Sequence, residues 1–282
     1  MAAGSKLLFG WLPTLNVAQR LGRWLAVAMT YAVAVELIVY FFNLPKWTAG
    51  QEVAAGLWVV LGMLVVFRNN AANDRWWEAR RLWGQLINDS RNLALKAKAH
   101  AAAPAAEHSE LAELLVEFAN ALRLHLRGIA RDPEDAPCPM LHPPGAVAAR
   151  IHALLDRWNR SGALHHTIRA LDDHARGLMD VCGACERIRS SPLPSSYRAL
   201  LRSALALYVL FAPWSVALET RWWGVPILFV GLGFLFGIEV TAEEIEEPFG
   251  DGKDDLPLES FCTTIETFVQ RALAPGLADD SR

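Results

Sequence analysis

The chain has 282 residues, of which 53% are hydrophobic and 20% are charged, and its mean hydropathy is +0.19. A soluble protein of this length is usually less apolar and carries more charge, so the composition indicates a membrane protein. The net charge of −3 is too small to indicate a nucleic-acid-binding protein. The cysteines lack the spacing of a disulfide framework, which favours a reducing, cytosol-facing location for them. They are Cys138, Cys182, Cys185 and Cys262.

Four apolar segments follow one another along the chain. The residues before them do not have the pattern of a cleavable signal peptide. A helix needs about 20 apolar residues to cross the hydrocarbon core of a membrane, with about 17 as a practical minimum. The first and fourth segments reach that length, whereas the second and third are short and are expected to continue as helices beyond the bilayer. The segments cover residues 24–42, 53–67, 204–218 and 222–240.

The residues around these segments predict the side of the membrane that each connection occupies. The linkers within the two hairpins, residues 43–48 and 219–223, carry Trp, a typical interfacial residue. Arginines gather at the opposite ends of the segments, so the positive-inside rule places both termini and the central region in the cytoplasm. These arginines are Arg20, Arg23, Arg68, Arg75, Arg80, Arg81, Arg187, Arg189, Arg198 and Arg202.

The remaining sequence predicts further helices, so the fold class is all-α. Leucines in the central region recur at three- and four-residue spacing, and proline-rich loops interrupt it at residues 132–145 and 190–195. An acidic stretch at residues 243–259 precedes a last amphipathic helix over residues 260–273. We divide the single protomer into a first transmembrane hairpin (24–67), a cytosolic helical region (68–202), a second hairpin (203–240) and the acidic segment with its C-terminal helix (241–282).

One face of the second apolar segment has two interpretations. Val59, Met63 and Phe67 recur every four residues and therefore share a face of the helix. Around an axis formed by several subunits, such a face would form a hydrophobic constriction that gates by dewetting. In the other interpretation the same side chains pack against lipid or neighbouring helices.

A polar block, residues 68–84, begins where this apolar segment ends. Its first residues supply many hydrogen-bonding groups at a membrane exit, which indicates a helix-packing and assembly network: Asn69, Asn70, Asn73, Asp74 and Arg75, with Trp76 and Trp77 at the interface. A membrane enzyme would need a dense polar cluster at the bilayer surface, and Asn70, Asp74, Arg75 and Glu78 are the one dense candidate. The sequence contains no Walker loop, nucleophile elbow or paired catalytic carboxylates, so we expect no enzyme.

Three other features have structural interpretations that weigh more than chemical ones. Cys182 and Cys185 form a lone CxxC, which without a second pair is weak support for zinc or redox chemistry. His165, His166 and His174 lack an accompanying metal-site pattern and are expected on helix surfaces. Glu36 and Glu239 lie within and at the end of apolar segments. An acid at such a position faces protein or water rather than lipid, so Glu36 contacts either a vestibule, a neighbouring subunit or another helix.

The amino-acid sequences of several blocks resemble those of the bestrophin family of ion channels. The block at 67–71, with the Asp-Arg-Trp-Trp-Glu-Ala-Arg run at 74–80 and residues 82–84 and 88–91, is similar to bacterial bestrophins. Two further stretches agree, namely residues 184–197 and 247–258, and so do the order and spacing of the apolar segments. The resemblance covers roughly residues 21–273, and it implies a multi-pass protein of a bacterial inner membrane.

The resemblance implies a homopentamer around a central pore. The neck of that pore would have three apolar residues at four-residue spacing, the last of them eight residues before Arg75. These are again Val59, Met63 and Phe67, although Met63 departs from the bulky or branched residues usual there and would make a softer gate. A second, cytosolic constriction would lie near the Pro-x-Pro stretch, at Ile188 or Leu193.

In animal bestrophins the acidic segment forms a calcium clasp from backbone carbonyls and two Asp side chains. The matching candidates here are Glu247, Asp251, Asp254 and Asp255. Asp255 matches the second clasp Asp, but Gly252 stands where the first is expected, next to Lys253. We therefore expect that no cofactor is required. The segment is then an acidic linker with a structural turn, and the alternative is calcium control.

The function implied by the resemblance is conduction of small monovalent ions through an apolar neck. Such a neck carries no charge with which to select the sign of an ion, so charges in the vestibules must do so. The acidic tail gives a slight preference for cations, whereas the cytoplasmic arginines, and the animal relatives, favour anions such as chloride. The alternative is a non-conducting membrane scaffold or regulatory protein of the same fold.

Overall fold

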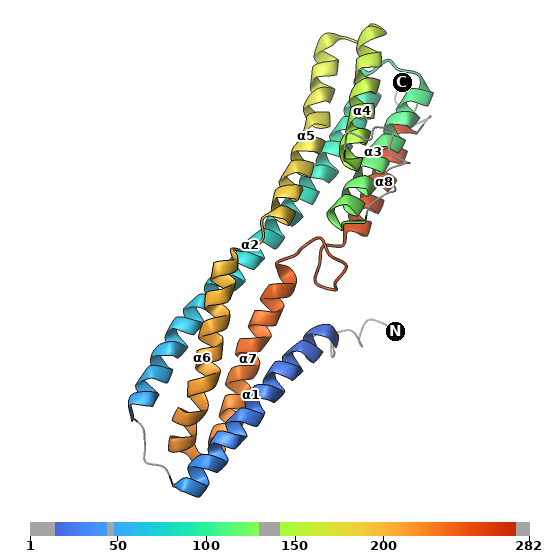
Figure 1. Ribbon diagram of the computed structural model, residues 1–282. Helices are drawn as coiled ribbons and strands as arrows, with labels where there is room; N and C mark the ends of the chain where they lie inside the picture. Colours follow the sequence, from blue (N-terminus) through green and yellow to red (C-terminus); the bar gives the residue numbers. More distant parts are fainter. Residues whose placement is uncertain (1–14, 44–47, 130–141, 275–282) are drawn as a thin grey trace, which may run out of the picture. The chain divides into compact units, whose positions relative to one another are not determined.

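The structure is a computed structural model that describes residues 15–43, 48–129 and 142–274. Every regular element within these ranges is a helix, as the sequence predicts (Figure 1). Cys138 and parts of two connecting segments, residues 44–47 and 130–141, lie outside the described residues. The helices are α1 (Leu15–Phe42), α2 (Thr48–His100), α3 (Ala105–Leu126), α4 (Pro143–Arg160), α5 (His165–Ser190), α6 (Ser195–Thr220), η2 (Arg221–Trp223), α7 (Gly224–Ile245) and α8 (Leu258–Leu273).

Four of the described helices, α1, α2, α6 and α7, are long and apolar enough to cross a membrane. α2 and α6 extend beyond the short apolar segments, as expected. α2 has 53 residues, which corresponds to about 80 Å at 1.5 Å per residue. It contains no proline, and it passes without a break from the second apolar segment through the polar block.

The chain divides into two compact units. The first unit comprises residues 1–74 and 193–246, and the second comprises residues 75–192 and 247–282. The predicted cytosolic region, residues 68–202, is therefore longer than the matching part of the second unit. Residues 68–74, which include the buried Arg68, and residues 193–202, in which α6 begins at Ser195, belong to the first unit.

The helices of the first unit pack through two clusters. In one cluster, small residues let α1 approach α6 and α7 closely; its members are Ala28, Ala32, Ala212, Leu228 and Leu232. In the other, branched side chains of α2 contact α6 and α7; its members are Leu61, Val65, Leu201, Leu205 and Leu235. A hydrogen bond from the Tyr197 hydroxyl to the Leu64 carbonyl, 2.7 Å long, adds a polar tie between α6 and α2.

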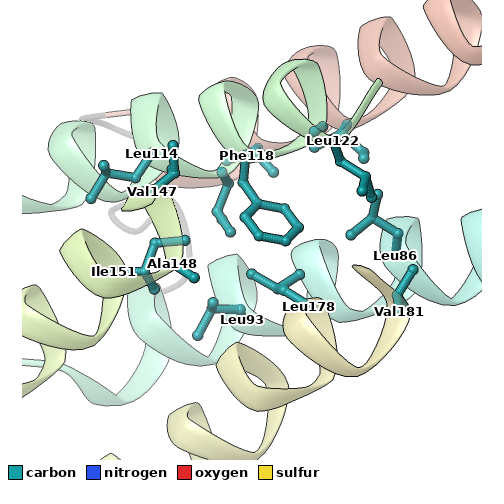
Figure 2. Packing of buried hydrophobic residues seen from close by; sticks show 14 of the residues in the cluster. Leu86, Leu93, Leu114, Phe118, Leu122, Val147, Ala148, Ile151, Leu178 and Val181 are labelled. Atoms are coloured by element: carbon teal, nitrogen blue, oxygen red, sulfur yellow. The ribbon is translucent and has the colours of Figure 1, made fainter. Parts of the chain in front are cut away.

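The second unit has one hydrophobic core, to which the later part of α2 and helices α3, α4, α5 and α8 all contribute. Figure 2 shows Phe118 of α3 among side chains from α2, α4 and α5. Each fully buried Leu or Phe contributes about 1.5–3 kcal/mol relative to an exposed one. The amphipathic pattern seen in the sequence thus gives a helical bundle with its own core. α8 begins at Leu258, two residues before the predicted start.

Candidate functional site

α2 presents an exposed apolar face in the first unit. Leu61 and Val65 are buried against α6 and α7, whereas Val59, Met63 and Phe67 are 71%, 59% and 54% exposed. Side chains four residues apart lie above one another on a helix, so these three form one stripe. The face that the sequence predicts as a pore neck is therefore uncovered in the protomer.

The exposed face changes character immediately after Phe67. Asn70 and Asp74, the next residues on the same side of the helix, are exposed and polar. A helix face that changes from apolar to polar within one turn matches the passage from hydrocarbon to water. Asn70 and Asp74 remain candidates for contacts between subunits or for lining a vestibule.

Arg68, which follows Phe67, is buried and ion-paired. Its side chain is 1% exposed, and its Nε lies 3.0 Å from Glu239 of α7. Its Nη2 lies 3.4 Å from Glu246, and another oxygen of Glu246 accepts the backbone N–H of Leu193 at 3.2 Å. Removing one partner of such a buried pair leaves an uncompensated charge, which is strongly destabilising. The cluster therefore ties α2, α7 and the start of the α6 segment together beside the exposed stripe.

The sequence identifies Arg68 only as a positive charge at a membrane exit and does not indicate its burial. Acids that end an apolar span, Glu239 and Glu246, are the signal that could have suggested the cluster. Glu36 of α1 is also buried within the protomer, at 3% exposure. This burial favours contact with another helix over contact with a vestibule.

Arg75 and Trp76 of the polar block make hydrogen bonds within the second unit. Arg75 donates through Nη1 to the Ser191 carbonyl at 2.5 Å and through Nη2 to the Ile188 carbonyl at 2.6 Å. The last carbonyls of a helix have no partner within the helix, so Arg75 caps the C-terminus of α5 and complements its dipole. Trp76 donates from Nε1 to the Asp254 carbonyl at 3.0 Å. Trp77 is 52% exposed and stacks edge-on against Trp76.

The two candidates for the second constriction differ in exposure. Ile188 belongs to the hydrophobic core of the second unit and is 6% exposed, whereas Leu193 is half-buried in the first unit. A residue that lines a pore must be reachable from outside its own protomer. The burial of Ile188 therefore favours Leu193, and the constriction itself stays a prediction.

The acidic segment does not gather its carboxylates around a common point. The Asp251 carboxylate lies 3.2 Å from Nη2 of Arg127, and a carboxylate oxygen of Asp255 accepts the Gly252 N–H at 2.5 Å. Glu247 and Asp254 are exposed. A β-carbon at Gly252 would lie 2.8 Å from the Asp255 carboxylate, which leaves no room there for the first clasp Asp unless Asp255 moves. The described residues thus form a closed turn at Gly252 and Asp255, and calcium control stays a prediction.

Two arginines hold the end of this segment. Arg127, which directly follows α3, forms a bidentate pair with Glu259 of α8, and Arg123 of α3 contributes a second contact at 3.0 Å. The hydrogen bond from Arg127 is the main cause that lowers the pKa of the Glu259 carboxyl to about 2. Burial raises the pKa of Asp255, and the hydrogen bond from Gly252 counteracts this.

The three described cysteines of the second unit, Cys182, Cys185 and Cys262, are buried. Burial raises the pKa of Cys182 and of Cys185 to about 12, and that of Cys262 to about 11. Thiols with such values are poor nucleophiles and poor metal ligands at neutral pH. His165 and His166 are exposed as expected. His174 is more buried than expected, because its Nδ1 lies 3.0 Å from the Asp89 carboxylate.

Within residues 15–43, 48–129 and 142–274, one group brings three metal-binding side chains close together: His125, His142 and Glu186. His125 contacts Glu186 at 2.8 Å. The Nδ1 of His142 accepts the backbone N–H of Gly145 at 3.2 Å, so a neutral His142 carries its proton on Nε2, which faces Glu186. A protonated nitrogen cannot bind a metal, and we assign this group to hydrogen bonding. Its members come from three separate segments, and no sequence signal links them.

Comparisons with known proteins agree with this fold. The family profile described as Bacterial/Fungal Bestrophin protein matches residues 6–271. The voltage-dependent anion channel-forming protein of a Nostoc species is 35% identical over 236 residues, which are 78% of this chain and 77% of the relative. A protein of the same description from a Synechocystis species is 32% identical over 262 residues, which are 86% of this chain and 84% of the relative.

Solved structures show the same fold. A bacterial bestrophin homologue from Klebsiella pneumoniae matches with a TM-score of 0.77 at 22% identity, over 88% of this chain and 97% of that one. A crystal structure described only as a membrane protein matches with a TM-score of 0.81 at 21% identity, over 90% and 99%. A helical membrane protein with this arrangement is of the bestrophin class. The chain belongs to the bacterial and fungal bestrophin family.

Proposed function

We propose that the protein is an ion channel whose pore neck is lined by Val59, Met63 and Phe67. The observation that carries this proposal is the exposed apolar stripe on α2. The opposite face of the same helix packs against α6 and α7, so the stripe is a second apolar face that the protomer leaves uncovered. The names of the relatives, which describe channel-forming proteins, support it. An apolar ring holds an energy barrier by excluding water, and the pore conducts when the ring widens or hydrates.

We further propose a homopentamer in a bacterial inner membrane, with both termini in the cytoplasm. An axis needs several copies of α2, because one exposed stripe cannot enclose a pore. The positions of the arginines relative to the four spans support the orientation. Asn70, Asp74 and Trp77 are exposed where α2 leaves the apolar zone, which supports a role for them in contacts between subunits.

The sign of the permeating ion depends on charges outside the neck. The residues of the acidic tail that gave a slight preference for cations are in part engaged: Glu246 pairs with Arg68, and Asp251 and Glu259 pair with Arg127. The relatives' names describe anion channels. On these grounds we propose anion conduction.

We propose that conduction needs no bound cofactor. The closed turn formed by Gly252 and Asp255 supports this part of the proposal. Removal of divalent ions with a chelator should leave the current unchanged, and a current that disappears on chelation and returns with calcium would contradict it.

The experiment that tests the proposal is the reversal potential of purified protein in a planar bilayer under a KCl gradient. Reversal toward the chloride equilibrium potential is expected. Reversal toward the potassium potential would keep the channel but overturn anion conduction. No current from fully assembled protein would favour the non-conducting scaffold. Two measurements test the alternative of a membrane enzyme. If the parent protein turns over no lipid and the Asp74→Asn variant no longer assembles, the polar block has a structural role.

A further inference from the structure

A groove of about 710 Å³ lies between α1, α6 and α7 in the first unit. Its walls are largely apolar, and they include Trp24 and Val27 of α1, Ala206 and Val209 of α6, and Phe236 of α7. Trp24 and Val27 are 63% and 67% exposed, so the groove is open along α1. A space of this size and character is typical of a site for an apolar ligand.

One end of the groove is charged. Arg20 of α1 and Arg202 of α6 both line it, and both contact the same oxygen of Glu243 of α7, at 3.6 and 3.5 Å. The arginine side chains are 52% and 62% exposed. Glu239, the other acid of the lining, is already paired with Arg68. Two guanidiniums therefore share one carboxylate and retain unused donors.

The three charged residues lie at one depth. At 1.5 Å per residue, Arg20 is about 33 Å from Phe42 at the end of α1, and Arg202 is about 27 Å from the end of α6. Glu243 is about 29 Å from the start of α7 by the same measure. These lengths match the hydrocarbon core of a bilayer, which is about 30 Å thick. The charged end of the groove therefore lies at the level of lipid headgroups, and the apolar part lies at the level of acyl chains.

We propose that this groove binds one anionic glycerophospholipid per subunit. Its phosphate contacts Arg20 and Arg202, and one acyl chain lies against Trp24, Val27 and Val209. Arginine recognises phosphate with parallel hydrogen bonds, and two guanidiniums facing one carboxylate favour an added negative charge. An indole one helical turn inside the headgroup level is also typical of a lipid interface. The site is separate from the proposed neck, and it does not depend on conduction.

The experiment is native mass spectrometry of the purified assembly after incubation with dioleoyl-phosphatidylglycerol, or with dioleoyl-phosphatidylcholine as the neutral comparison. The wild-type protein should retain one phosphatidylglycerol per subunit and at least tenfold less phosphatidylcholine. The R20Q/R202Q variant should retain at least tenfold less phosphatidylglycerol than the wild-type protein. R23Q, a change at an exposed arginine of the same helix that does not line the groove, should retain it fully.

A second variant tests the apolar part with both arginines in place. Ala206 is exposed on the wall of the groove, so A206W should fill the space and lower lipid retention while the assembly stays intact. Equal retention by R20Q/R202Q and R23Q would overturn the proposal. If A206W instead separated the assembly into monomers, the groove would be a contact with a second copy of the chain, and the lipid site would be wrong.

Discussion

The Nε of Arg68 lies 3.0 Å from a carboxylate oxygen of Glu239, and both side chains are buried between α2 and α7. The pair stands one residue beyond Phe67, the last member of the exposed stripe. A fixed charge at this point holds the end of the proposed neck against the rest of the first unit. We therefore expect Val59 and Met63 to move more than Phe67 when the proposed neck widens.

Replacing Arg68 with Met should destabilise the protein by about 3–5 kcal/mol, because Glu239 and Glu246 would remain buried without their cation. The midpoint of thermal unfolding in detergent, followed by size-exclusion chromatography, measures this. Arg23→Gln, at an exposed position, is the control. Equal midpoints for the two variants would show that the buried pair is not needed for stability.

Gly177 of α5 faces Asp89 of α2 in the second unit. A β-carbon at Gly177 would lie 2.6 Å from the Asp89 carboxylate, whereas one at Gly183 of the same helix meets nothing within 4 Å. Gly177→Ala should therefore cost about 1–3 kcal/mol through crowding. Gly183→Ala should stabilise by about 0.5–1 kcal/mol through helix propensity. Chemical denaturation of both variants tests this, and a stabilising Gly177→Ala would contradict the crowding against the Asp89 carboxylate.

The buried thiols should resist alkylation. With a pKa of about 12 for Cys182 and Cys185, roughly one thiol in ten thousand is a thiolate at pH 8, against about one in ten for a free cysteine. In a Cys138→Ser background, reaction with iodoacetamide should be at least a hundredfold slower in the native protein than after denaturation. Rapid native labelling of Cys182 or Cys185 would restore the redox interpretation of the CxxC pair.

The Glu259 contact with Arg127 predicts a pH dependence of stability. The pKa of this carboxyl is about 2 in the folded protein and near 4.5 when unperturbed. Its stabilising contribution is therefore complete above pH 4.5 and is lost as the pH falls from 4.5 toward 2. The difference in unfolding midpoint between the parent and Glu259→Gln should be largest at pH 6 and should shrink at pH 3. Glu113→Gln, at an exposed position on α3, serves as the control, and a difference that does not change with pH would contradict the assignment.

The sequence predicted the helices well and the polar contacts poorly. Periodicity and apolar length depend on residues close in the chain, so they located α1, α2, α6 and α7 and the stripe at Val59 and Met63. The partners of Arg68 and Arg75 are more than 100 residues away, and no local pattern indicates them. Ile188 is different, because it continues the three- and four-residue spacing of Leu178, Val181 and Cys185 on the buried face of α5, and this local pattern indicates its burial.

The most direct test of the account is the current through purified protein in a planar bilayer when Val59, Met63 and Phe67 are all replaced by Ala. If these residues form the apolar barrier, the variant should carry a larger current than the parent. Val60→Ala, at an exposed position a quarter turn away on the same helix, should leave the current unchanged. An unaltered conductance and open probability in the triple variant, with assembly intact, would contradict the neck assignment and with it the proposed mechanism.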